Sequence, residues 1–218
     1  MSRNNSLNSI KDEIDKKVKI VVVSKTRSKK EILDIYNKDH IDFGENKVQE
    51  ILEKHEKLPK DIRWHFIGHL QTNKVKYIVP FISLIHSVDS LKLLKEINKR
   101  AKIKNKVINC LIQVKIANEE SKYGFKINEI SDVMSYASEL EHILIKGLMG
   151  MATNTDNNNL INKEFKLLNT EFKKYKSVNF DVLSMGMSND YRVALEEGST
   201  IIRVGTKIFG ERIKWILE

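Results

Sequence analysis

The amino-acid sequence predicts an α/β fold of the (β/α)8 TIM-barrel class, preceded by one extra helix. Eight runs rich in β-branched residues recur along the 218 residues, with amphipathic segments between them. Several of these runs are continuously apolar, which is typical of parallel strands that are covered on both faces. Barrels of this class form one domain of about 200–250 residues. We therefore expect a single domain over residues 1–218.

The expected elements alternate in the order that a barrel requires. Strands are expected at residues 18–24, 41–43, 63–67, 84–88, 107–116, 143–149, 182–185 and 201–204. Apolar residues at helical spacing predict helices at 29–37, 46–55, 72–79, 90–103, 127–139, 160–175 and 191–197. Residues 1–17 are expected to form the extra helix, with Ser90 as a later N-cap and Gly198 at a helix C-terminus. A doubly wound sheet is the weaker alternative, because no Gly-x-Gly-x-x-Gly follows the first strand.

The composition predicts a cytoplasmic protein without a membrane partner. No apolar stretch approaches the ~18 residues that span a bilayer, and the first residues lack the apolar core of a secretory signal. Cys110 is the single cysteine, which excludes an internal disulfide and fits a reducing compartment. Its apolar surroundings favour a buried structural thiol. We expect a monomer, since the sequence shows no apolar patch that demands a partner.

The formal net charge of +9 raises the alternative of a nucleic-acid partner. The distribution of charge argues against it, because the lysines are spread over helical segments among acidic residues, as around Glu96 in 91–100. The chain also lacks zinc-finger spacing, a ribonucleoprotein aromatic motif and a dense arginine run. A solvated, lysine-rich surface is the favoured interpretation, and we expect no nucleic-acid partner.

Lys25 ends the first expected strand, so its amine would lie at the C-terminal face of the barrel, where active sites of this fold gather. A neutral amine can form a Schiff base with an aldehyde, and burial lowers the pKa of a lysine amine. The alternative is a lysine that leaves the strand and reaches solvent. The spacing alone leaves both interpretations open.

Small and hydroxylated residues follow the seventh and eighth expected strands. Ser188 ends the turn Ser184-Met-Gly-Met-Ser188, and Gly205 and Thr206 close the last strand. Barrels frequently hold a phosphate after these two strands through backbone N–H groups, and glycine allows the backbone a close approach to a ligand. Together with Lys25, this arrangement indicates pyridoxal phosphate (PLP). The alternative is that both segments are ordinary tight turns.

Arg203 lies two residues before Gly205 and would point into the same mouth, where it needs an anion or another acceptor. Two partners stay open for it: the pyridine nitrogen of PLP, or a structural salt bridge with Glu45. His65 and His69 lie four residues apart across a strand end, without a third ligand. We therefore expect no zinc site there.

Several motifs, in order along nearly the whole chain, resemble those of a known family. They are Val22-Val-Ser-Lys25-Thr26, Phe43-Gly-Glu-Asn46, Trp64-His-Phe-Ile-Gly-His-Leu-Gln71, Ser87-Val-Asp89, Glu120-Ser-Lys-Tyr-Gly-Phe125, Leu183-Ser-Met-Gly-Met-Ser188 and Gly198-Ser-Thr-Ile-Ile-Arg-Val-Gly-Thr206. Through these motifs the chain resembles the pyridoxal phosphate homeostasis proteins, single-domain relatives of the alanine racemase N-terminal barrel.

The resemblance implies that the protein binds, buffers and delivers PLP in vitamin B6 homeostasis, with PLP-dependent apo-enzymes as partners and with no catalytic or metal-binding residues. It also implies a role for each cofactor-binding residue: Lys25 for the internal aldimine, Arg203 for the pyridine nitrogen, Ser188, Gly205 and Thr206 for the phosphate, and Asn46 and Met187 for the pocket lining.

An amino-acid racemase is the competing hypothesis. Racemisation at an α-carbon uses a base on each face of the cofactor, so Lys25 needs a partner base. By the same resemblance, that base comes from a second, β-rich domain in alanine racemases, and the residues after Phe209 are too few to supply one. The sequence therefore favours a PLP carrier over an enzyme.

Overall fold

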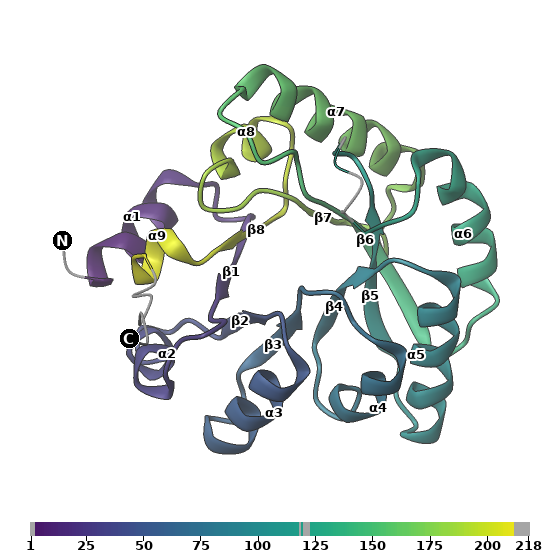
Figure 1. Cartoon of the computed structure of the whole chain (residues 1–218), viewed down its shortest axis with the longest axis horizontal. Helices are drawn as coiled ribbons and strands as arrows, with labels where there is room; N and C mark the ends of the chain where they lie inside the picture. Colours follow the sequence, from purple (N-terminus) through teal and green to yellow (C-terminus); the bar gives the residue numbers. More distant parts are fainter. Residues whose placement is uncertain (1–2, 118, 120–122, 212–218) are drawn as a thin grey trace, which may run out of the picture.

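A computed structural model describes residues 3–117, 119 and 123–211 of the chain. Its described residues contain a closed barrel of eight parallel strands in sequential order, in which β8 pairs with β1 (Figure 1). The strands are β1 (Lys19–Val23), β2 (Asp42–Glu45), β3 (Arg63–Phe66), β4 (Leu84–Val88), β5 (Ile108–Val114), β6 (Ile143–Gly150), β7 (Val182–Ser184) and β8 (Ile201–Val204). The predicted fold class is confirmed, and each strand lies at its expected place.

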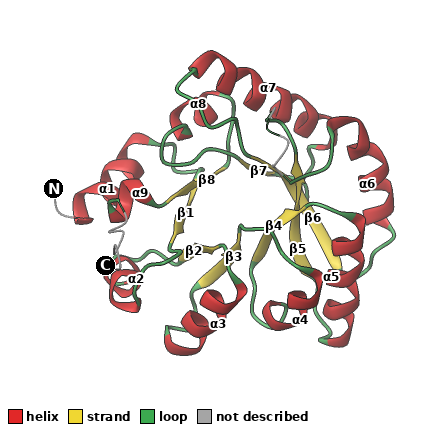
Figure 2. Cartoon of the chain, viewed as in Figure 1, coloured by secondary structure: helices red, strands yellow, loops and turns green. Residues whose placement is uncertain are grey.

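Helices surround the barrel and connect successive strands, as Figure 2 shows. They are α1 (Arg3–Glu13), α2 (Lys29–Tyr36), α3 (Val48–Lys57), α4 (Val75–Ile78), α5 (Leu91–Ile103), α6 (Ile130–Ser138), α7 (Asn158–Tyr175), α8 (Tyr191–Glu196) and α9 (Thr206–Phe209). The extra helix α1 precedes β1, and it lies beside α9 at one side of the barrel (Figure 1).

Local signals in the sequence mark several helix ends. Ser90 caps α5, since its side chain accepts from the Leu93 N–H, and Gly198 follows α8 with a positive φ of 84°. Both expectations are therefore confirmed. Two expected helices begin with short 3-10 turns, η1 (Thr72–Lys74) and η2 (Ile127–Glu129). The sequence did not predict α9, because a four-residue helix is too short to show apolar periodicity.

Apolar side chains pack in two places. The larger group lies between the barrel and its helices and includes Ile51 of α3 and Phe165 of α7. The smaller group lies in the barrel interior and comprises Val21, Leu84, Leu111, Met149 and Ile201. Each fully buried side chain of this size contributes about 1.5–3 kcal/mol relative to exposure. The two groups fix the strand ends that carry the candidate site.

Other expectations concern burial and membranes. Cys110 is fully buried, as expected, and burial raises the pKa of its thiol. None of the helices in the described ranges is both long and apolar enough to cross a lipid bilayer. Residues 1–2 of the expected N-terminal helix and residues 120–122 of the motif 120–125 lie outside the described residues.

Candidate functional site

A cavity of about 660 Å³ opens at the C-terminal ends of the strands. The structure brings all seven predicted cofactor-binding residues to its wall: Lys25, Asn46, Met187, Ser188, Arg203, Gly205 and Thr206. They come from the ends of β1, β2, β7 and β8, which are neighbours only in the closed barrel. The volume falls within the range of about 300–1,000 Å³ that small-molecule sites occupy.

A buried ionic cluster holds the backbone on both sides of Lys25. Lys54 of α3 donates to the Ser24 carbonyl oxygen (2.9 Å) and to Glu45 Oε1 (2.7 Å). On the other side, the Thr26 N–H donates to Glu50 Oε2 (2.7 Å), which also lies 3.2 Å from Lys54 Nζ. The cluster of Ser24, Glu45, Glu50 and Lys54 therefore fixes the two peptide groups that flank Lys25.

Thr26 shows why this support is needed. Its φ of 64° lies in the left-handed region, where a β-branched residue is a conformational outlier. A conformation of this kind costs about 1–3 kcal/mol and persists only when its surroundings enforce it. The hydrogen bond from the Thr26 N–H to Glu50 supplies such a constraint.

The Glu45 carboxyl is fully buried within the same cluster. Burial raises its pKa, and the nearby Lys54 and Ser24 only partly oppose that effect. Ser24 Oγ donates to Glu45 Oε1 at 2.6 Å, whereas Oε2 has no hydrogen-bond partner. One oxygen of the Glu45 carboxyl is therefore paired twice, and the other is left without a hydrogen-bond partner.

The β7–α8 loop forms the opposite wall of the cavity. Gly186 adopts a φ of 91°, and a Cβ there would lie 2.6 Å from the Ala194 Cβ, so the turn requires glycine. Past this turn, the Met187 N–H donates to Asp190 Oδ1 (2.5 Å). Ser188 Oγ accepts from the Gly205 N–H at 3.3 Å. The loop therefore places a hydroxyl beside the backbone N–H groups that follow β8.

Arg27 connects the two walls, and the sequence did not single it out. Its guanidinium donates to the Gly210 carbonyl oxygen (2.5 Å) and lies 5.2 Å from the centre of the Phe209 ring. It thus ties the segment after Lys25 to α9, which begins at Thr206. The β6–α7 loop also lines the cavity with residues 151–156, where Thr153 donates to the buried Glu164.

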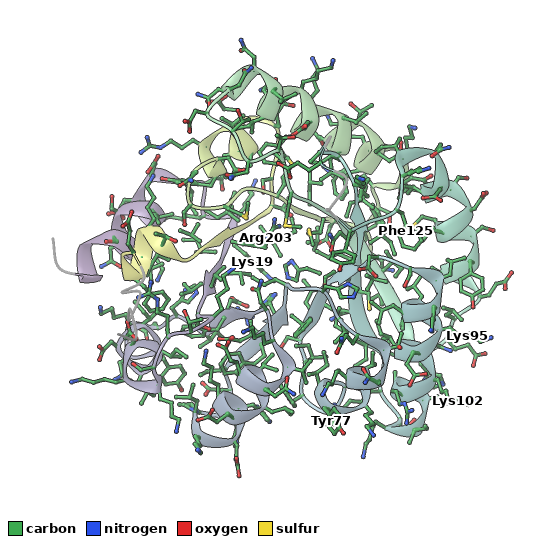
Figure 3. All side chains as sticks on the ribbon, in the orientation of Figure 1. Lys19, Tyr77, Lys95, Lys102, Phe125 and Arg203 are labelled. Atoms are coloured by element: carbon green, nitrogen blue, oxygen red, sulfur yellow. The ribbon has the colours of Figure 1, made fainter. Side chains whose placement is uncertain are left out.

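Arg203 is buried at the base of the cavity, within the ring of strands (Figure 3). Its Nη1 donates to Ser184 Oγ (2.6 Å) and its Nη2 to the Gly150 carbonyl oxygen (3.0 Å). Burial lowers the pKa of its guanidinium to about 10. The salt bridge with Glu45 that the sequence left open is wrong, because Glu45 pairs with Lys54 instead.

The two histidines do not form a metal site. His69 Nδ1 lies 2.8 Å from Asp89 Oδ2 and its ring stacks on Tyr123, whereas His65 contacts Asp42 inside the barrel. Within the described ranges, no group of three or more His, Cys, Asp or Glu side chains could hold a metal ion. The two histidine rings therefore lie in different environments and have different partners.

Comparison with known proteins places the chain in a family. Residues 3–213 match the family described as "Alanine racemase, N-terminal domain". A pyridoxal phosphate homeostasis protein of Aquifex aeolicus is 42% identical over 198 residues, which cover 89% of this chain and 87% of that protein. One from Helicobacter pylori is 41% identical over 197 residues and covers 89% and 88%. The chain belongs to this family.

Solved structures agree with this membership in the pyridoxal phosphate homeostasis family. PipY of Synechococcus elongatus without PLP has a TM-score of 0.90 at 31% identity, over 94% of this chain and 99% of that chain. PipY with PLP bound has a TM-score of 0.86 at 29% identity, over 96% and 100%. An alanine racemase of Clostridium difficile shares the fold, with a TM-score of 0.78 at 17% identity, and this chain covers 56% of it.

Proposed function

We propose that this chain binds PLP in the cavity at the barrel mouth and acts as a PLP carrier in PLP homeostasis. The observation that carries the proposal is the convergence of an amine, a guanidinium and a hydroxyl-bearing, glycine-containing loop on one cavity of suitable volume. The names of the similar proteins and the PLP-bound PipY structure support the same function.

Lys25 is the residue that we propose binds PLP covalently. Its neutral amine would add to the aldehyde carbon of PLP, and the aldehyde oxygen would leave as water when the carbon–nitrogen double bond of the Schiff base forms. The ionic cluster around Lys54 supports this role, since it fixes the backbone before and after Lys25. A fixed backbone limits the directions in which the amine can reach.

The remaining groups fit the rest of the cofactor. Ser188, Gly205 and Thr206 would hold the phosphate through hydroxyl and backbone N–H groups, and Arg203 would face the pyridine nitrogen. Asn46 provides the test of fit within the structure: its Oδ1 is buried without a hydrogen-bond partner, although the residue lines the cavity. An orphaned acceptor of this kind is costly unless a ligand donates to it, and together with Met187 it would line the bound ring.

We further propose that the protein delivers PLP to apo-enzymes in the cytoplasm. It would act there as a monomer and not as an enzyme. The cavity is open at the barrel mouth, which suits entry and release of the cofactor. A Schiff base is reversible by hydrolysis, so a bound cofactor can be released without a separate catalytic step.

The first experiment is the visible absorption spectrum of the purified protein with PLP, before and after borohydride reduction. We expect a Schiff-base band in the wild type that borohydride traps, and loss of that band in Lys25→Ala. Lys29→Ala changes a lysine on the neighbouring helix α2 and should keep the band. A wild type without the band at excess PLP would contradict the proposal. Solvent deuterium uptake by L-amino acids would instead indicate a racemase.

A further inference from the structure

An unbroken line of polar side chains crosses the barrel interior from the cavity to the opposite end. Arg203 Nη1 lies 2.6 Å from Ser184 Oγ, and Ser184 Oγ lies 2.9 Å from His86 Nδ1. His86 Nε2 lies 2.9 Å from His65 Nδ1, and His65 Nε2 lies 2.9 Å from Asp42 Oδ1. Asp42 is the first residue of β2, so the line runs from the mouth of the barrel to the start of a strand.

The chemistry of the two ends fixes the direction of every hydrogen bond. A guanidinium only donates, so Ser184 Oγ accepts from Arg203 and has its own proton left to give to His86 Nδ1. An ionised carboxylate only accepts, so His65 Nε2 carries a proton and donates to Asp42. With both histidines neutral, the middle bond runs from His86 Nε2–H to His65 Nδ1. One arrangement of protons satisfies the whole chain.

Burial supports this protonation state. Ser184 and His86 are fully buried, and burial lowers the pKa of His86 well below that of a free histidine, which keeps it neutral. Burial alone would raise the pKa of Asp42, but hydrogen bonds from His65 and Arg63 outweigh it and lower that pKa to about 2. Asp42 is therefore the ionised end of the chain at neutral pH.

Among the described residues no carboxylate contacts the Arg203 guanidinium, and Asp190 of the β7–α8 loop favours its charge only from a distance. Among the described residues its guanidinium donates to one hydroxyl and one carbonyl oxygen, both uncharged. A buried charge without compensation is expensive, and hydrogen bonds linked in series polarise one another. Each bond in the chain points its positive end toward Asp42, so the oxygen of Ser184 becomes a better acceptor for Arg203.

We propose that Asp42, His65, His86 and Ser184 are positioning residues for Arg203: their directed hydrogen-bond chain holds the guanidinium in one orientation at the base of the cavity and links it to the carboxylate of Asp42. The chain itself is independent of any ligand. Its consequence for PLP rests on the proposed function, because Arg203 faces the pyridine nitrogen only if PLP occupies the cavity.

The first test examines the chain without PLP. Two-bond nitrogen–hydrogen NMR correlations of ¹⁵N-histidine-labelled protein distinguish the two neutral tautomers and the cation of each imidazole ring. We expect both rings to carry a proton on Nε2 and to accept a hydrogen bond at Nδ1. The signals are assigned by their loss in His65→Gln and His86→Gln. A proton on Nδ1 of His86 would reverse the bond to Ser184 and overturn the inference.

The second test measures PLP affinity by absorbance titration. His86→Leu removes both hydrogen bonds of His86, so Ser184 is no longer oriented toward Arg203, and PLP binding should weaken about tenfold. His86→Gln keeps one acceptor and one donor on the side chain and should stay within about threefold of the wild type. Leu111→Ala opens space in the apolar barrel interior and removes no hydrogen bond of the chain, and it should also leave the PLP affinity nearly unchanged.

The outcomes of these two tests distinguish the proposed PLP-binding function from the proposed positioning role of the hydrogen-bond chain. A wild type that does not bind PLP removes the proposed function, and the tautomers then decide the hydrogen-bond chain alone. A wild type that binds PLP while His86→Leu and His86→Gln bind equally well overturns the positioning role. Equal weakening in His86→Leu, His86→Gln and Leu111→Ala overturns it too, because that pattern reports general loosening of the barrel.

Discussion

Two polar networks support the two sides of the cavity, and they use charge in opposite ways. Behind Lys25, the ionic cluster brings three charged side chains into direct contact, with Lys54 within 2.7 Å of Glu45 and 3.2 Å of Glu50. Behind Arg203, the partner of Nη1 is a neutral hydroxyl, and the carboxylate of Asp42 lies at the far end of a chain through Ser184 and two histidines.

The difference follows from the two faces of the strands. Glu45 follows Gly44, which is in register with the interior residue His65, so alternation turns Glu45 outward toward α3. There it meets Lys54 and can hold a peptide backbone. Arg203 faces inward, where its guanidinium contacts a hydroxyl and a carbonyl oxygen and, among the described residues, no carboxylate. The barrel interior of this protein therefore contains a chain of hydrogen-bonded polar side chains, whereas the space between the strands and the helices holds a compact ionic cluster.

The largest effect that tests this comparison is the loss of Lys54. Lys54→Met leaves Glu45 buried without its cation, so the free energy of unfolding should fall by about 3–5 kcal/mol. Lys57→Met is the matched control on the same helix, since Lys57 is half exposed and pairs with the exposed Glu53. That control should change stability by less than about 1 kcal/mol. Urea denaturation measures both, and equal effects would show that the cluster does not hold the strand end.

A smaller effect concerns the stability of the protein at acidic pH. The pKa of Asp42 is about 2 in the fold and 3.8 in a free side chain, so ionised Asp42 stabilises the protein above pH 4. This stabilisation, about 2 kcal/mol, disappears as the pH falls from 4 through 2. We expect Asp42→Asn to lose correspondingly less stability than the wild type over this interval. The measurement is urea unfolding at several pH values.

Leu111→Ala is the control for the acid experiment. It lowers stability by creating a cavity in the apolar interior, by about 2–5 kcal/mol, and introduces no change of charge. Its deficit should therefore be the same at pH 4 and pH 2. An Asp42→Asn variant whose stability follows the wild type in parallel through acid would show that the carboxylate is not strongly paired.

The sequence predicted the fold and the wall of the cavity because both depend on local pattern. Parallel strands end on one rim, so reading the strand ends was enough to place Lys25, Ser188 and Gly205 together. It did not predict the hydrogen-bond chain, although His65 and His86 are polar residues within apolar strands and could have signalled it. Pairing His86 with Ser184, 98 residues further on, requires the closed barrel and its register.

The smallest effect compares one serine from each network. Ser24→Ala removes a hydrogen bond to Glu45 Oε1, which still accepts from Lys54, so the cost should be about 1 kcal/mol with unchanged PLP affinity. Ser184→Ala leaves both His86 Nδ1 and Arg203 Nη1 buried without that partner, and it should cost more and weaken PLP binding. Urea denaturation and absorbance titration of the two variants give this comparison. If the PLP affinities of both variants fall equally, both serines support the cavity in the same way. The proposed contrast between the ionic cluster and the hydrogen-bond chain is then wrong.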